Sequence, residues 1–227
     1  MYERLGVTLI LGLLSGCVNT GQLTSNTESV DMSLEAATFD QDGIGFLTPV
    51  SATGQEADRV ALALSFANAV AESRPDLKVV SLANVLSSVN QAGLADDYKN
   101  MVDDYQGTGI MEKETLLRIG EASDVRYLGL LSLGEFSQGT NKRFSLAGIR
   151  LFDTKQASIR LSWQIWDSRT GAIAWEGSDE IHYAYDTSRE RPVNLSFVAE
   201  QAAANMMAKI PSPDDAELER VAVATAE

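Results

Sequence analysis

Residues 158–175, SIRLSWQIWDSRTGAIAW, decide the fold of this chain, because two strand patterns meet there at a turn. Before the turn, side chains alternate between an apolar parity (Ile159, Leu161, Trp163, Ile165) and a polar one (Ser158, Arg160, Ser162, Gln164). The turn is Asp167 to Gly171, and the apolar parity resumes at Ile173 and Trp175. This stretch predicts two long antiparallel strands joined by a hairpin, with one packed face and one polar face.

The segments around this hairpin predict a sheet with helices packed on it. Val125–Phe136 is apolar on both parities, which is typical of a strand buried on both faces. A strand with mixed faces is expected over 144–152, and short strands at 44–47 and 77–82. Helices are expected over 55–73, 83–91, 94–106, 112–122 and 195–209. The order predicts an α/β (α+β) fold: a mixed sheet with long antiparallel C-terminal hairpin strands and helices on it.

This order resembles the periplasmic domains of three groups of envelope proteins: CsgG-like secretion-channel lipoproteins, penicillin-binding-protein activator lipoproteins and the TolB amino-terminal domain. The resemblance covers about 44–208. It is carried by the strands at 44–49 and 77–82, the helix after Gln55, the helix-to-strand junction 121–128 and the hairpin 166–175. It implies the fold, and relatives of this fold scaffold envelope assemblies or activate partner enzymes. The sequence lacks the pair of long amphipathic hairpins of the secretion channel, so a pore role is not expected.

The amino terminus predicts a lipoprotein signal peptide. The apolar run from Leu5 to Leu14 is too short to span a bilayer but has the length of a signal-peptide core. It ends in Leu14-Ser15-Gly16-Cys17, which matches the lipobox of bacterial lipoproteins: cleavage falls between Gly16 and Cys17, and Cys17 then carries lipid, including palmitate. The alternative is a chance cysteine after a short apolar segment. Cys17 is the only cysteine, so it can form neither an internal disulfide nor a fourfold Cys/His zinc site.

The predicted organisation has four parts: a signal peptide (1–16), a lipidated flexible tether (17–39), one globular domain (40–210) and an acidic C-terminal tail (211–227). Residues 18–38 are small and polar without apolar periodicity, and Pro211 and Pro213 end the last helix. Val18 stands where lipoproteins of the inner membrane usually carry Asp, which favours the outer membrane, facing the periplasm. The net charge of −14 argues against a nucleic-acid partner, so the expected membrane contact is the acylated Cys17.

Few residues are candidates for chemistry. His182 is the only histidine and lies on the polar parity of its strand, so a metal or catalytic role is not expected. Asp96-Asp97 and Asp103-Asp104 are interpreted as a solvated helix face rather than a calcium or acid–base site. No dinucleotide, phosphate-loop or nucleophile-elbow motif occurs. We therefore expect no catalytic residue, no metal and no cofactor.

Three tryptophans surround the hairpin. Trp163 and Trp175 lie on the apolar parity and are expected in the core. Trp166 lies on the opposite parity, where packing on the second face of the sheet is favoured over an exposed contact for an envelope protein partner. The sequence thus predicts a non-catalytic adaptor or assembly factor of the cell envelope. A ligand-binding lipoprotein is the alternative, and an enzyme with an unrecognised carboxylate site is the third hypothesis.

Overall fold

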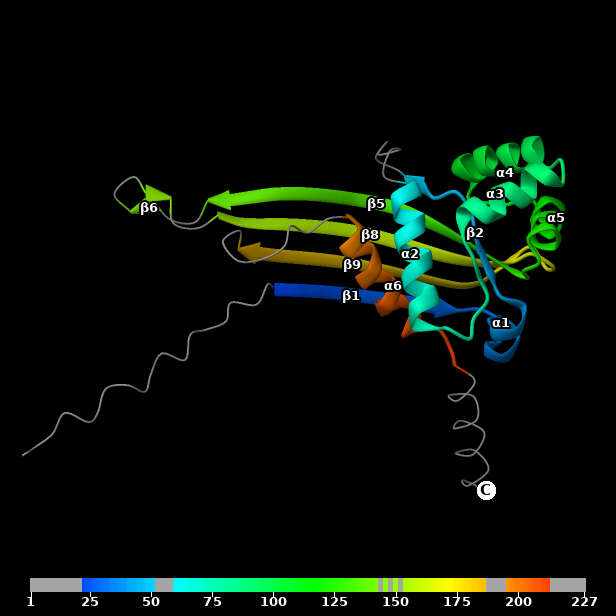
Figure 1. Cartoon of the computed structure of the whole chain (residues 1–227), viewed down its shortest axis with the longest axis horizontal. Helices are drawn as coiled ribbons and strands as arrows, with labels where there is room; N and C mark the ends of the chain where they lie inside the picture. The colour runs from blue at the N-terminus through cyan, green and yellow to red at the C-terminus, as the bar shows by residue number, and fades with distance from the viewer. Residues whose placement is uncertain are drawn as a thin grey trace, which may run out of the picture.

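The computed structural model describes residues 22–51, 59–142, 145–146, 149–150, 153–186 and 195–212. These residues form a seven-stranded mixed sheet with six helices packed on it, which confirms the predicted fold class (Figure 1). The strands of the sheet are β1 (Gln22–Asp31), β2 (Ile44–Phe46), β3 (Val50–Ser51), β4 (Val79–Val80), β5 (Tyr127–Lys142), β8 (Asp153–Asp167) and β9 (Ala172–Asp186). The helices are α1 (Ala36–Asp42), α2 (Arg59–Ser73), α3 (Leu82–Gln91), α4 (Ala95–Thr108), α5 (Lys113–Ser123) and α6 (Leu195–Met207).

The strand order is β1-β9-β8-β5-β2-β4, with β3 also paired to β5. β5, β8, β9 and β1 form an antiparallel half of long strands. β2, β3 and β4 are short and join β5 in a parallel half. β8 and β9, which form the predicted hairpin, are therefore the two central strands of the antiparallel half. Their turn lies level with the first residues of β5.

The alternation along β8 corresponds to two differently covered faces. Ile159, Leu161 and Trp163 are fully buried, whereas Arg160 is exposed. α2 and α6 pack on each other and on the apolar face. α3, α4 and α5 gather at one end of the sheet and cover the other face only there (Figure 1). The first part of β5, residues 127–133, is covered on both sides, as expected from its apolar residues on both parities.

Trp163 lies at the centre of the core on the α2 side. Its indole is 5.1 Å from the ring of Phe66, 5.5 Å from that of Trp175 and 6.0 Å from that of Phe46, measured between centroids. Gly129 on β5 leaves the room that this indole needs, because a Cβ there would lie 2.8 Å from its Nε1. The close approach of β5 to Trp163 thus requires glycine.

The structure corrects the tether that the sequence predicts over 17–39. Residues 22–31 form β1, which pairs with β9 along its whole length, and Phe39 of α1 is fully buried. Residues 17–21 lie outside the described part of the chain. β1 is an edge strand with exposed, mostly polar side chains, and it is held by main-chain hydrogen bonds. Such a strand needs no apolar periodicity, and so its sequence resembles a linker.

A buried carboxyl fastens β1 to the domain. Asp179 of β9 is fully buried; it accepts hydrogen bonds from the Thr27 hydroxyl (3.0 Å) and from the Asn205 amide of α6 (2.8 Å). Burial raises the pKa of Asp179, and these two hydrogen bonds only partly offset that effect. The edge strand, its neighbour and a covering helix therefore meet at one polar group.

Two further expectations are revised. The described residues of 144–152 form two short strands, β6 (Ser145–Leu146) and β7 (Ile149–Arg150), which pair with each other instead of forming one strand. A two-residue pairing has too few residues for a strand periodicity. In the C-terminal region, the helix ends at Met207, and residues 213–227 of the predicted acidic tail lie outside the described residues.

The domain boundary can be tested by truncation. A chain that starts at Asp40 lacks β1 and the buried Phe39, and it leaves Asp179 without Thr27. We expect it to lose at least the roughly 3–5 kcal/mol typical of removing a buried phenylalanine, relative to a chain spanning 22–212. Thermal unfolding followed by circular dichroism measures the difference. Equal melting temperatures would show that β1 and α1 contribute nothing to the core.

Candidate functional site

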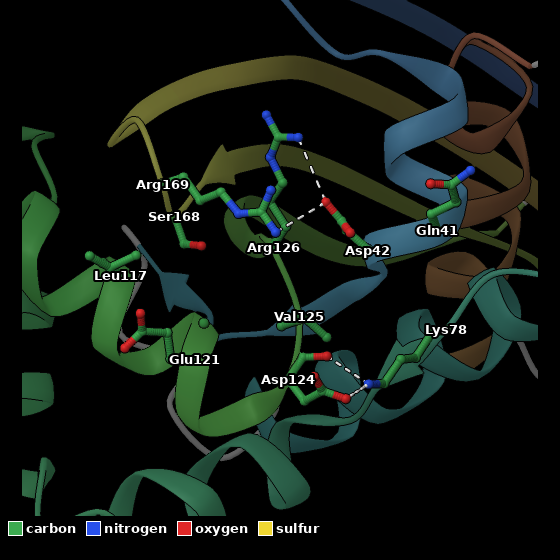
Figure 2. A pocket seen from close by; sticks show the side chains of 11 residues that line it. Gln41, Asp42, Lys78, Leu117, Glu121, Asp124, Val125, Arg126, Ser168 and Arg169 are labelled. Atoms are coloured by element: carbon green, nitrogen blue, oxygen red, sulfur yellow. Dashed lines mark hydrogen bonds and ion pairs between the residues drawn. The ribbon is translucent and has the colours of Figure 1, made fainter.

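A cavity of about 450 Å³ lies where four segments meet at the amino-terminal end of β2, β4 and β5 (Figure 2). The segments are the end of α1, the residue before β4, the α5–β5 junction and the β8–β9 turn. The lining is charged and polar, with Asp42, Lys78, Glu121, Asp124, Arg126 and Arg169 around it. In an open parallel sheet, ligands bind beyond the carboxyl ends of the strands, so this cavity lies at the opposite end.

The α5–β5 junction forms one wall of the cavity. Asp124 ends α5 in a left-handed conformation, with φ of 53°. The Val125 N–H donates to the Gly120 carbonyl (3.0 Å), which closes the helix end. The Lys78 ammonium donates to the Asp124 carboxylate and to its main-chain carbonyl (2.6 Å). The hydrogen bond from Lys78 lowers the pKa of Asp124, so this side of the cavity holds a paired cation and anion.

A network of two arginines and two aspartates forms the other wall. Arg126 donates to the Asp167 carboxylate from Nη2 (2.8 Å) and Nε (3.2 Å), and its other terminal nitrogen lies 3.7 Å from Asp42. Arg169 reaches the same Asp42 oxygen at 3.5 Å, so Asp42 lies between two guanidinium groups (Figure 2). The network joins α1, the start of β5 and the hairpin turn.

Asp167 is the buried member of this network. Desolvation raises the pKa of its carboxyl, but hydrogen bonds from Arg126 and from the Arg169 N–H outweigh that effect, and the pKa lies below its ordinary value of 3.8. The ionised form therefore stabilises the folded chain at neutral pH. That contribution is lost as the pH falls through the lowered pKa of the folded state.

The lining can hold a ligand by charge but brings no reactive pair together. Its cations are already matched by carboxylates, and the Ser168 hydroxyl is buried without a histidine or a second nucleophile in the described lining. A small polar molecule with charges of both signs could compete for these partners. In the structure, the ion pairs around the cavity connect separate segments of the fold to one another.

The predicted site residues do not gather in this cavity. Gly16 and Cys17 lie outside the described residues. His182 is exposed on the uncovered sheet face, with its Nε2 3.1 Å from Glu180. Asp96, Asp103 and Asp104 are exposed on α4, and Asp97 pairs with Arg118 at 2.6 Å. Across the described ranges, no group of three or more His, Cys, Asp or Glu side chains is arranged to hold a metal ion.

Trp166 is 4% exposed and packs against Tyr105 of α4, with its Nε1 donating to Gln164 at 3.2 Å. This agrees with the favoured packing on the second face, and the alternative of an exposed partner contact is wrong.

The sequence does not predict the Arg126–Asp167 ion pair, because the two residues are 41 positions apart and neither belongs to a motif of recognisable spacing. The only sequence signal is an opposite charge at the end of each of two predicted strands.

Comparison with known proteins identifies the fold but no family. No family model matches the chain, and no curated protein matches it. Among solved structures, the PelC dodecamer from Paraburkholderia phytofirmans superposes with a TM-score of 0.51 at 12% identity, over 83% of this chain and 99% of that one. This likeness shows a shared fold.

Two weaker superpositions are with Lipoprotein GNA1162 from Neisseria meningitidis and E. coli LpoB. The first has a TM-score of 0.38 at 15% identity over 74% of this chain and 98% of that one. The second has a TM-score of 0.36 at 14% identity over 61% and 55%. The narrower resemblance to CsgG-like and TolB domains stays a prediction. Among the described helices, none is long and apolar enough to cross a membrane.

The charge network can be tested with a matched pair of substitutions. Arg126→Met leaves the buried Asp167 carboxylate unpaired, and we expect a loss of roughly 3–5 kcal/mol in the free energy of unfolding at neutral pH. Arg169→Met removes an exposed contact and should cost less than about 1 kcal/mol. Urea unfolding at several pH values measures both effects. The Arg126→Met loss should shrink as acid protonates Asp167, and a loss independent of pH would refute the assigned role.

Proposed function

We propose that this chain is an envelope lipoprotein, cut before Cys17 and anchored there in the outer membrane, that works in the periplasm as a non-catalytic adaptor or assembly factor. The observation that carries this proposal is the Leu14-Ser15-Gly16-Cys17 motif, which contains the only cysteine of the chain. Two or three acyl chains on one residue hold a protein on a bilayer stably, whereas one binds only marginally.

The order of segments fits an anchored scaffold. The first described strand begins at Gln22, five residues after the proposed lipid attachment. The globular domain is therefore held near the membrane by a short link. Its charged cavity has paired ions, and its exposed sheet face is polar, which suits recognition by another protein more than chemistry on a substrate.

We further propose that the scaffold is a homo-oligomer. The solved protein that shares the fold is described as a dodecamer. In this chain the first half of α2 exposes two large apolar side chains: Val60 is 67% exposed and Leu64 54%, one helical turn apart, while the opposite side of the helix is buried in the core. Neighbouring exposed apolar side chains lose contact with water when another protein covers them, so this surface suits a contact between copies.

Ligand binding is the second candidate, and the cavity of about 450 Å³ favours it. That volume falls in the usual range for small-molecule sites. The polar lining would select a compact molecule with charge of both signs. Isothermal titration of such molecules into the wild-type chain and into Lys78→Met would separate this role from the scaffold role. Heat of binding that is lost in Lys78→Met would support ligand binding.

Anchoring is tested by Cys17→Ala. No other thiol is available, so the substitution should abolish labelling by a palmitate analogue and release the chain from the membrane fraction. Ser15→Ala keeps a small residue in the motif and serves as the processed control. Continued labelling of Cys17→Ala would rule out lipidation at this residue.

Self-association is tested on the lipidated chain in detergent. Val60→Glu with Leu64→Glu places two charges on the exposed side of α2, so the oligomer should dissociate in sedimentation-velocity runs while the melting temperature stays within a few degrees. Ile110→Glu, at a residue that is 66% exposed near the end of α4, is the matched control and should leave the oligomer intact. A monomeric wild-type chain, or equal effects of both variants, would contradict the proposed interface.

A further inference from the structure

The edge strand β1 is attached to the domain almost entirely by its main chain. It lies at the end of the described sheet and pairs with β9 (Figure 1). Among its described side chains, those of residues 23–31, only Thr27 is partly buried and the others are exposed. A residue of an edge strand shares main-chain hydrogen bonds with one neighbouring strand rather than two, although ordering its backbone costs as much entropy. Little besides the main-chain bonds to β9 therefore holds β1.

One side chain fastens the middle of β1. The Thr27 hydroxyl donates to Asp179 (3.0 Å), whose other carboxylate oxygen accepts from Asn205 of α6 (2.8 Å). Asp179 is fully buried, and burial raises the pKa of its carboxyl, so the ionised form is less favourable here than in water. Detachment of β1 takes Thr27 away and opens this carboxyl to water. Hydration of the carboxylate thus partly offsets the hydrogen bond that detachment breaks.

The chain is firmly fixed where β1 ends. The N–H groups of Met32 and Ser33 both donate to the Ala174 carbonyl of β9, at 3.0 Å each. Leu34 is 4% exposed in the core, and its N–H donates to the Asp31 carboxylate (3.0 Å). α1 follows directly and packs in the same core. Detachment that starts at the first residue of β1 therefore ends at Asp31.

We propose that β1 is a releasable strap: residues 22–31 detach from β9 as a unit while the rest of the domain stays folded, and this changes how the domain is held at the membrane. The change at the membrane rests on the proposed lipid anchor, whereas the detachment itself does not. A strap of this kind switches the domain between a fixed and a free orientation.

The two states differ in the link to Cys17. With β1 docked, five peptide steps join Cys17 to Gln22, so the membrane lies within about 18 Å of that end of the strand. With β1 released, the link runs from Cys17 to Asp31, fourteen steps that span at most about 50 Å. The attachment point has then moved from one end of β1 to the other. The docked strap keeps the Gln22 end of the sheet near the membrane, and the released strap lets the domain turn.

The competing arrangement is a strand that opens only when the whole domain unfolds. Hydrogen exchange of single amides, measured on the lipidated chain in detergent, distinguishes the two. Alternate residues of β9 bond to β1 and the others bond to β8, because the pairing is antiparallel on both sides. We expect the β9 amides that bond to β1 to exchange together with β1, at least about 100-fold faster than those that bond to β8. Equal exchange of the two sets would overturn the proposal.

Substitutions at the fastening identify what holds the strap. Thr27→Val keeps the branched shape but leaves one buried oxygen of Asp179 without its donor, so β1 should exchange about tenfold faster. Thr24→Val, at an exposed threonine of the same strand, is the matched control and should change the rate less than about twofold. Asp179→Asn removes the charge, keeps an acceptor for Thr27 and lets the Asn205 amide turn to accept, so β1 should exchange more slowly. Equal acceleration in both valine variants, or faster exchange in Asp179→Asn, would overturn these assignments.

The membrane link is tested on the lipidated chain in vesicles. Lipid occupies the Cys17 sulfur, so His182→Cys, at an exposed residue opposite Thr24, supplies the only free thiol for a donor fluorophore. Acceptor-labelled lipid should receive strong energy transfer in the docked background Asp179→Asn. Thr24→Pro with Thr27→Pro prevents β1 from pairing and should weaken the transfer, while the amides between β8 and β9 stay protected.

The outcomes of the vesicle experiment separate the two proposals. Equal energy transfer in the docked and proline backgrounds would overturn the change of link, and loss of protection between β8 and β9 in the proline variant would overturn detachment as a unit. Flotation with the vesicles reports the anchor separately, because a chain that does not float refutes lipidation and leaves the exchange result standing.

Discussion

The burial of Trp163 between the long sheet and α2 is the interaction on which the rest of the structure depends. The indole contacts the rings of Phe46, Phe66 and Trp175, so one side chain joins β2, α2, β8 and β9. It fits only because Gly129 on β5 has no side chain. Once this face is packed, the opposite parity of β8 must face away from α2 and α6. α3, α4 and α5 cover that second face only at one end, which leaves Arg160 and His182 in solvent.

The partial cover divides the molecule into two ends with different physical properties. At the helical end both faces of the sheet are packed, and Arg126, Asp167 and Asp42 tie the first residues of β5 to the hairpin turn and to α1. Towards the other end the strands run past the helices, and β1 closes the sheet with main-chain bonds and the buried Asp179 (Figure 1).

The proposed function follows from this division. The described chain begins at β1, and the exposed Val60 and Leu64 lie on the outer side of α2, which covers the apolar face of the sheet. An anchor at one end and a protein contact along a helix can act together without obstructing each other. The charged cavity lies at the helical end, where its ion pairs contribute to stability and a ligand would have to displace them.

The sequence by itself determined the elements whose patterns are local. The alternation along 158–165 and the turn at 167–171 predict β8 and β9, and the helical spacing of apolar residues predicts α2 to α6, because each pattern repeats within a few residues. The tertiary structure alone decided three other features. β1 has no apolar period, since an edge strand is held by its main chain. Trp166 is buried because α4 lies over it, and this decided between the packing that the sequence favoured and the exposed contact that it left open. Arg126 meets Asp167 only through the register of β5 on β8, and a register between segments 41 residues apart is set by packing rather than by spacing along the chain.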